Sequence, residues 1–251
     1  KLQQTILRLP KDVKAEDNWE RRCKGTTCSQ TIYSKDKYFV KEDDSVDLLE
    51  NALENDCEGV SELCAKGKRY RADFKQTPLE EETIVFTRED QKIAFQPLQL
   101  RYVNGAQEIL LSSANPVYGY GENNTYSYPN IFGLGTEIRL TVEPQLLKEE
   151  IIFSYISLLT NNNIQGTDGY IYIDYLVNLS DNLTFVSSQG AITPQLNELY
   201  FFNSSPLDSF SENIAILPQP FITSTTSIQL IDYALMQTVD GLVLSLRVPV
   251  D

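Results

Sequence analysis

Four cysteines, 35 carboxylates and 14 tyrosines are the residues of this 251-residue chain that could do chemistry, and it contains no histidine. The lack of histidine excludes a Ser-His-Asp or Cys-His nucleophile pair, a His-ligated zinc and an imidazole that titrates between pH 5 and 8. The sequence also lacks a phosphate-binding loop, a dinucleotide-binding glycine pattern and a GxSxG motif. We therefore expect a protein that is not an enzyme. A carboxylate-based glycoside hydrolase is the enzymatic alternative, because that chemistry needs two Asp or Glu side chains.

The cysteines all lie in the first 64 residues, at Cys23, Cys28, Cys57 and Cys64. An even number of cysteines in one polar segment favours two disulfides that staple a subdomain with a small core. The connectivity stays open, as do free thiols and a metal site, although neither spacing matches the close CxxC pairs of zinc sites. Disulfides persist in oxidising compartments, so we expect an extracellular, cell-surface or virion/particle-surface location.

The charge of the chain is strongly negative, at −14, because Lys and Arg number only 21. Such a field repels nucleic-acid phosphates, so we expect no nucleic-acid partner. No run of eighteen apolar residues occurs, and we expect no transmembrane helix. Fifteen of the basic residues lie within residues 1–78, and none lies within 149–246. The ten carboxylates of that stretch therefore lack a local basic partner, which leaves water, backbone, a metal or another chain.

Calcium is the one cofactor that these carboxylates suggest, with Asp168 and Asp174 as weak candidate ligands. The Asp-rich spacing of an EF-hand loop is absent from the chain. We otherwise expect no cofactor, and solvated carboxylates are the ordinary interpretation.

A long loop rich in Gly, Asn and Pro, residues 115–136, carries five aromatic residues: Tyr118, Tyr120, Tyr126, Tyr128 and Phe132. Tyrosines in such loops can stack on a sugar or on a partner surface, since they combine apolar area with a hydroxyl. The alternative is that they cover one end of the fold. N-glycosylation is permitted by four Asn-x-Ser/Thr sequons, a number close to chance, at Asn123, Asn178, Asn182 and Asn203.

The elements that would position these residues are short strands over residues 79–251. Apolar residues alternate in Ile138-x-Leu140-x-Val142 and again from Ile171 to Val177, which predicts strands with one buried face. At the end of the chain, Asp240-Gly241 predicts a hairpin turn that sets Tyr233 opposite Val248. Nine to eleven such strands predict an antiparallel β-sandwich or jelly-roll.

The first 78 residues predict a different kind of segment, a helical or irregular subdomain behind an amino-terminal arm. Apolar spacing and a capping serine predict a helix over residues 46–65. The arm, residues 1–19, could add a short strand at residues 5–9 to a neighbouring subunit. Thr77-Pro78-Leu79 interrupts the pattern and predicts the boundary between domains 1–78 and 79–251.

The function we expect is that of a structural or adhesive subunit that assembles through its β-sandwich. Few charges in the strands, outward-facing tyrosines and a terminal hairpin open to edge pairing favour protein partners or self-assembly. The alternative is a carbohydrate-binding module that uses the tyrosine-rich loop to bind glycans.

Overall fold

The computed structural model describes residues 2–8, 19–24, 27–32, 38–40, 46–48, 52–55, 57, 63–66, 70–88, 90–143, 146–152, 159–162, 164, 168–181, 183–187, 199–203, 213–217, 219–223 and 228–250. Of these, the backbone but not the side chains is described before residue 52. Helical backbone in the described residues is confined to one turn at residues 159–161. The protein is mainly β, with antiparallel sheets, as the sequence predicts.

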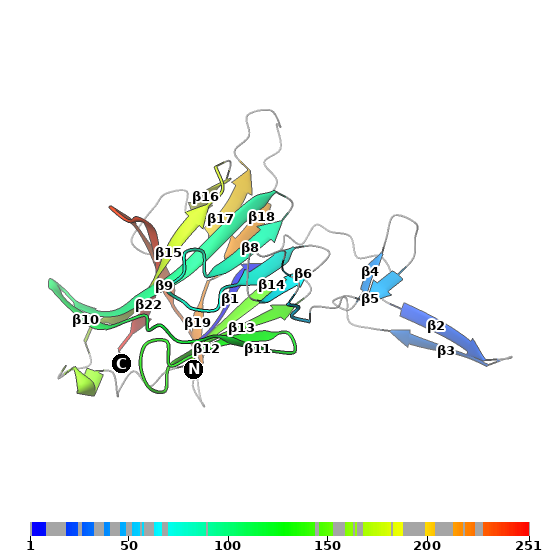
Figure 1. Cartoon of the computed structure of the whole chain (residues 1–251), viewed down its shortest axis with the longest axis horizontal. Helices are drawn as coiled ribbons and strands as arrows, with labels where there is room; N and C mark the ends of the chain where they lie inside the picture. Colours follow the sequence, from blue (N-terminus) through cyan, green and yellow to red (C-terminus); the bar gives the residue numbers. More distant parts are fainter. Residues whose placement is uncertain are drawn as a thin grey trace.

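The first large sheet has ten strands, and its central strand comes from the start of the chain (Figure 1). In order across the sheet its strands are β11 (Tyr120–Glu122), β12 (Thr125–Pro129), β13 (Glu137–Glu143), β14 (Leu146–Ile152), β1 (Leu2–Arg8), β18 (Asn213–Leu217), β17 (Leu199–Asn203) and β16 (Leu183–Ser187). Two further strands continue beside β1, namely β19 (Phe221–Thr223) and β20 (Ile228–Leu230).

The second large sheet has eight strands, all from residues 63–249. Its order is β21 (Asp232–Thr238), β22 (Gly241–Pro249), β15 (Tyr170–Leu179), β9 (Gln91–Asn104), β8 (Ile84–Arg88), β7 (Arg71–Phe74) and β6 (Leu63–Lys66), with β10 (Gln107–Ser113) paired to β9. Two separate hairpins, β2 (Trp19–Lys24) with β3 (Thr27–Ile32) and β4 (Tyr38–Val40) with β5 (Val46–Leu48), lie to the right of both sheets in Figure 1.

The two large sheets share one hydrophobic core. The rings of Phe74 in β7 and Tyr126 in β12 stack with centroids 5.0 Å apart, and the Tyr175 hydroxyl of β15 donates a 2.7 Å hydrogen bond to Glu149 of β14. These contacts join the apolar faces that the alternating patterns predict. The finer prediction of a sandwich or jelly-roll topology stays a prediction.

The predicted buried faces of two strands are confirmed. In β13, Ile138, Leu140 and Val142 are buried while the residues between them are half-buried. The inward positions of β15 that the alternation predicts are buried in the same way: Ile171, Ile173, Tyr175 and Val177.

The terminal hairpin also forms, but its predicted register is wrong by two residues. Strands β21 and β22 pair Thr238 with Gly241, Leu235 with Leu244, and Tyr233 with Leu246. Gly241 starts β22 with φ at 133°, and the Thr238 hydroxyl donates to its carbonyl oxygen at 2.9 Å, so the turn closes one residue earlier than expected. An even displacement keeps the paired side chains on their predicted faces, while Val239 falls in the turn and is fully exposed.

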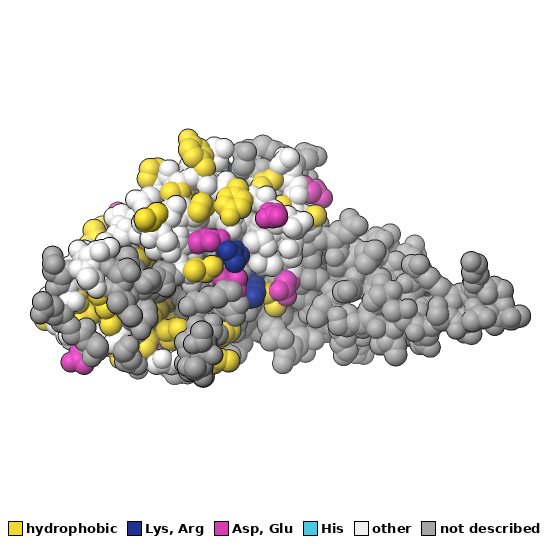
Figure 2. All heavy atoms as spheres, turned by 90° about the horizontal axis from the view of Figure 1, so that it is seen from below, with side chains coloured by type: hydrophobic (Ala, Val, Ile, Leu, Met, Phe, Trp, Pro, Cys, Tyr) yellow, Lys and Arg dark blue, Asp and Glu magenta, His cyan; other side chains and the backbone are white. Residues whose placement is uncertain are grey.

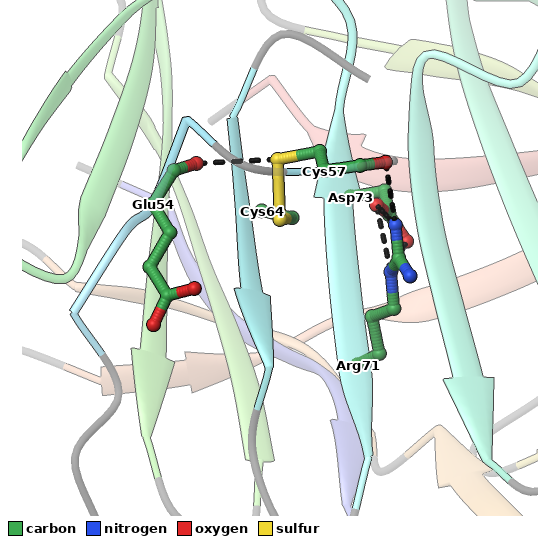
Figure 3. The surroundings of a disulfide bond; sticks show 5 residues. All are labelled: Glu54, Cys57, Cys64, Arg71 and Asp73. Carbon is green, nitrogen blue, oxygen red and sulfur yellow. Dashed lines mark hydrogen bonds and ion pairs between the residues drawn. A yellow bond between two sulfur atoms is a disulfide. The ribbon is translucent and has the colours of Figure 1, made fainter. Parts of the chain in front are cut away.

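The predicted helix over residues 46–65 is wrong in the described residues. The segment begins with strand β5, and the backbone of Glu54 forms a β-bridge with Cys64 at the start of β6. The reason is the disulfide between Cys57 and Cys64, which confirms part of the cysteine prediction (Figure 3). Seven residues of helix would separate these Cα atoms by about 10.5 Å, whereas the disulfide holds them 5.7 Å apart.

The other two cysteines, Cys23 and Cys28, are register partners in the β2–β3 hairpin. Their bonding stays a prediction. The boundary expected at residue 78 does not divide the sheets, because β7 pairs with β8 across it and β1 belongs to the ten-stranded sheet. Among the described residues, no helix has the length and apolar character needed to cross a membrane.

Candidate functional site around strand β1

Strand β1 lies in the interior of the ten-stranded sheet, with partners on both of its edges. On one edge it pairs with β14 over six register positions, from Leu2 opposite Ile151 to Arg8 opposite Leu146. On the other edge, Leu2 and Gln3 pair with β19 and Arg8 pairs with β18. In the described part of the chain no other strand joins β14 to β18. We call the space between β14 and the β18–β19 edge the β1 slot.

The walls of the β1 slot contribute buried apolar side chains to the core. Leu147 and Ile151 of β14 are fully buried, and Ala215 and Leu217 of β18 are equally buried on the opposite wall. Removing a central strand from such a sheet would expose both walls and leave two rows of unpaired backbone groups. The sheet is therefore complete only when a strand occupies the slot.

A buried carboxylate lies within the wall of the slot. Glu149 is fully buried, occupies the β14 register position opposite Gln4, and accepts the hydrogen bond of the Tyr175 hydroxyl. Burial, and next the charge of Glu149, raises the pKa of Tyr175 well above its usual value, and the same two causes act on Tyr233. The carboxylate thus joins the β14 wall of the slot to the eight-stranded sheet through the buried Tyr175 hydroxyl.

Strand β1 is connected to the rest of the sheets through two hairpins that pair only with themselves among the described strands. The β2–β3 and β4–β5 pairs share no register position with either large sheet. The next strand of the chain that belongs to a large sheet is β6, which begins at Leu63. Moving β1 would therefore break no described strand pairing except its own.

The edge beyond β19 is apolar and exposed. Ile228 and Leu230 of β20 are 73% and 62% exposed, and β20 pairs with β19 alone among the described strands. The face seen from below in Figure 2 shows apolar side chains spread among polar ones, with Lys and Arg in one small group bordered by acidic side chains. Exposed apolar strands with a free edge are surfaces that natural proteins either protect or use for pairing.

The five aromatic residues predicted as ligand-binding candidates lie in two different settings, and ligand binding stays a prediction. Tyr126, Tyr128 and Phe132 are buried in the core, because residues 125–129 form strand β12 and place both tyrosines on its inner face. The two tyrosine hydroxyls donate to the carbonyl oxygen of Lys75 at 3.1 and 2.7 Å. Tyr118 and Tyr120 remain exposed, at 69% and 52%.

The two candidate calcium ligands differ in their surroundings. The Asp174 carboxylate is buried and accepts hydrogen bonds from Arg101 Nε at 2.5 Å, Ser245 Oγ at 2.6 Å and Gln99 Nε2 at 3.0 Å. Asp168 is exposed, and its carbonyl oxygen accepts a hydrogen bond from the Tyr102 hydroxyl. In the described residues, no three His, Cys, Asp or Glu side chains gather as metal ligands would. Calcium binding stays a prediction.

The Arg101–Asp174 pair lies in the wall of a cavity of about 350 Å³ on the eight-stranded sheet, which Glu108 and Asp240 also line. Burial alone would lower the pKa of Arg101, but its hydrogen bonds and charge interactions with Asp174 and Glu108 outweigh burial and raise that pKa. Sequence reasoning missed this pair, since the two residues are 73 positions apart. Two other carboxylates of the basic-free stretch also lie near arginines on neighbouring strands, Glu150 near Arg139 and Asp232 near Arg247.

The sequons lie in different settings. Asn123 is exposed in the β11–β12 turn, and Asn178 is half-buried near the end of β15. Asn203 ends β17, its side chain is not among those described, and Asn182 lies outside the described residues.

Comparisons with protein-family models, with curated proteins and with solved structures give no match for this chain.

Proposed function

We propose that this protein is a non-enzymatic structural subunit, extracellular or on a particle surface, that self-assembles through its β-sheets. The observation that carries the proposal is the place of β1: the first strand of the chain fills the centre of a sheet from which it can be detached without breaking another described pairing. A sheet whose central strand is followed by hairpins that pair with neither large sheet is suited to strand addition between subunits.

Two further observations support this function. The exposed apolar strand β20 continues the same sheet, which gives a neighbouring copy apolar area to bury. The Cys57–Cys64 disulfide fits an oxidising compartment, as expected of an extracellular or particle-surface subunit.

The test is the mass of the protein in solution. Size-exclusion chromatography with light scattering on the intact chain should give multiples of 28.5 kDa, and negative-stain images should show regular particles or filaments. The double variant Ile228→Lys/Leu230→Lys should reduce assembly, because charges would occupy the exposed β20 edge. Leu134→Lys is the matched control, since Leu134 is an exposed apolar residue, at 97%, away from β20. A monomer at every concentration would overturn the proposal.

Glycan binding is the second candidate, and the exposure of Tyr118 and Tyr120 is the observation that favours it. Saturable binding to a glycan panel, weakened by Tyr118→Ala or Tyr120→Ala, would support it. Binding unaffected by both substitutions would remove this site, and calcium should be included in one arm of the assay.

A further inference from the structure

We infer that the strand filling the β1 slot in the assembled protein is β1 of a second copy of this chain, inserted in the same register. The inference rests on the proposed function, and it adds the identity of the partner and the surface that the partner binds. The slot supplies the acceptor, and the amino-terminal strand supplies the donor.

The pairing of β1 indicates that the strand in the slot can come from either copy. Its three end positions, Leu2, Gln3 and Arg8, have register partners on both edges, so the slot defines the place of the strand along the sheet. An exchanged strand would make the same pairs with the same partners. Exchange between identical copies therefore loses none of the strand pairing that the closed monomer makes.

The connection of β1 allows the exchange. Residues 9–62 separate it from β6, and the described strands within that segment pair as two local hairpins. Residues 9–18 alone could span up to about 33 Å when extended, which exceeds the width of several strands in a sheet. Because the hairpins share no pairing with either large sheet, they can accompany β1 to a neighbouring copy.

The donor and the acceptor are different surfaces, which determines the kind of assembly. A contact between a strand on one copy and a slot on the next is heterologous, and its repetition produces an open filament or a closed ring. Every copy within a closed ring has a complete ten-stranded sheet. An open filament has one empty slot at one end and one free β1 at the other.

The register provides a direct test with single cysteines in separate copies. Thr5 of β1 lies opposite Lys148 of β14, a position whose Cα spacing in antiparallel sheets suits a disulfide. A Thr5→Cys chain and a Lys148→Cys chain are mixed, allowed to assemble, and oxidised gently. A linked pair of twice 28.5 kDa can then form only between copies, and peptide mass spectrometry identifies the bond.

The matched control replaces the acceptor by Thr141→Cys. Thr141 is the register partner of Lys148 on β13, one strand farther from β1 and about 10 Å from Thr5. We expect at least about tenfold more linked pair with Lys148→Cys than with Thr141→Cys, because the control Cα atoms lie beyond disulfide reach.

Two results would overturn the inference. If the assembled mixture gives no more linked pair than the control, while the Thr5→Cys/Lys148→Cys double variant links within one chain, β1 stays in its own copy. The protein would then assemble through another surface, and the proposed function would stand. If the intact chain does not assemble at all, both the inference and the proposed function fail.

Discussion

The two large sheets differ in where their central strands come from. In the eight-stranded sheet, β9 pairs with β8, its neighbour in sequence, and with β15 over ten register positions. In the ten-stranded sheet the central strand is β1, which pairs with β14 over six positions and with β18 and β19 over three. The eight-stranded sheet is built from residues 63–249 alone, whereas the ten-stranded sheet needs a strand from the start of the chain. One sheet takes all its strands from residues 63–249, and the other contains the slot that we propose a second copy fills.

The largest effect on the scaffold should come from breaking its buried ion pair. Arg101→Met would leave the Asp174 side chain, 1% exposed, without its cation and lower the free energy of unfolding by about 3–5 kcal/mol. Urea unfolding measures the loss. Replacing both partners, as Arg101→Met/Asp174→Leu, should cost less than the single change. A loss below about 1 kcal/mol for the single variant would mean that the pair behaves like a surface ion pair.

The disulfide should have a smaller effect on the same sheet. Cys57→Ser/Cys64→Ser opens a loop with a sequence separation of seven and should lower the free energy of unfolding by about 2–3 kcal/mol without changing the assembled mass. The matched control is Cys23→Ser/Cys28→Ser in the β2–β3 hairpin, which should leave unfolding of the sheets unchanged. Equal losses in both variants would show that the hairpin stabilises the scaffold, contrary to this comparison.

Deleting residues 1–10 should speed up amide hydrogen exchange in the ten-stranded sheet and leave it unchanged in the eight-stranded sheet. Amides of β14 that face the empty slot should exchange at least about tenfold faster. One hydrogen bond contributes about 0.5–1.5 kcal/mol to stability, and the deletion removes several hydrogen bonds between β1 and β14. Amides of β9 and β15 should keep their protection. An equal loss of protection in both sheets would show instead that β1 stabilises the whole fold.

The smallest effect is a fall in the free energy of unfolding at alkaline pH, which both sheets should share. Burial is the main cause that raises the pKa of Tyr128 in β12 and of Tyr233 in β21 well above the ordinary value of 10.0. The folded state therefore keeps a proton that the unfolded state loses near pH 10. Stability is fully present below that pH and falls above it by about 1.4 kcal/mol per pH unit for each such tyrosine.

Urea midpoints between pH 9 and 11 measure this slope, with Tyr128→Phe and Tyr233→Phe as the test variants. Each substitution should make the slope shallower by a similar amount, because the two rings share one core. A slope that changes for one variant only would show that the sheets unfold separately.

Local patterns predicted the strands whose alternation is visible along the chain. Residues 138–142 alternate cleanly and form a one-sided strand. In residues 171–177 the predicted inner positions are buried, but Asp174 on the other face is buried as well. The same signal was present in Tyr126-Ser127-Tyr128 of β12, where the surrounding glycines and asparagines suggested a loop. Period-two alternation would have placed both tyrosines in the core.

The sequence also contained a signal against the predicted helix. A helix over residues 46–65 and a disulfide between Cys57 and Cys64 exclude each other, since helical rise would hold the two cysteines too far apart. The β1 slot and the Arg101–Asp174 pair had no such signal, because they join residues more than 70 positions apart. A strand near residues 5–9 was predictable; the sheet that receives it was not.

Competition with the strand itself shows whether β1 of one copy completes the sheet of another. A synthetic peptide of residues 1–10 is added in excess while the intact chain assembles, and light scattering reports the mass, with a Thr5→Pro peptide as control. We expect the native peptide to occupy the slots, remain bound to the protein and lower the assembled mass, and we expect the control peptide to do none of these. An unchanged mass with no bound peptide would contradict the exchange of β1 between copies.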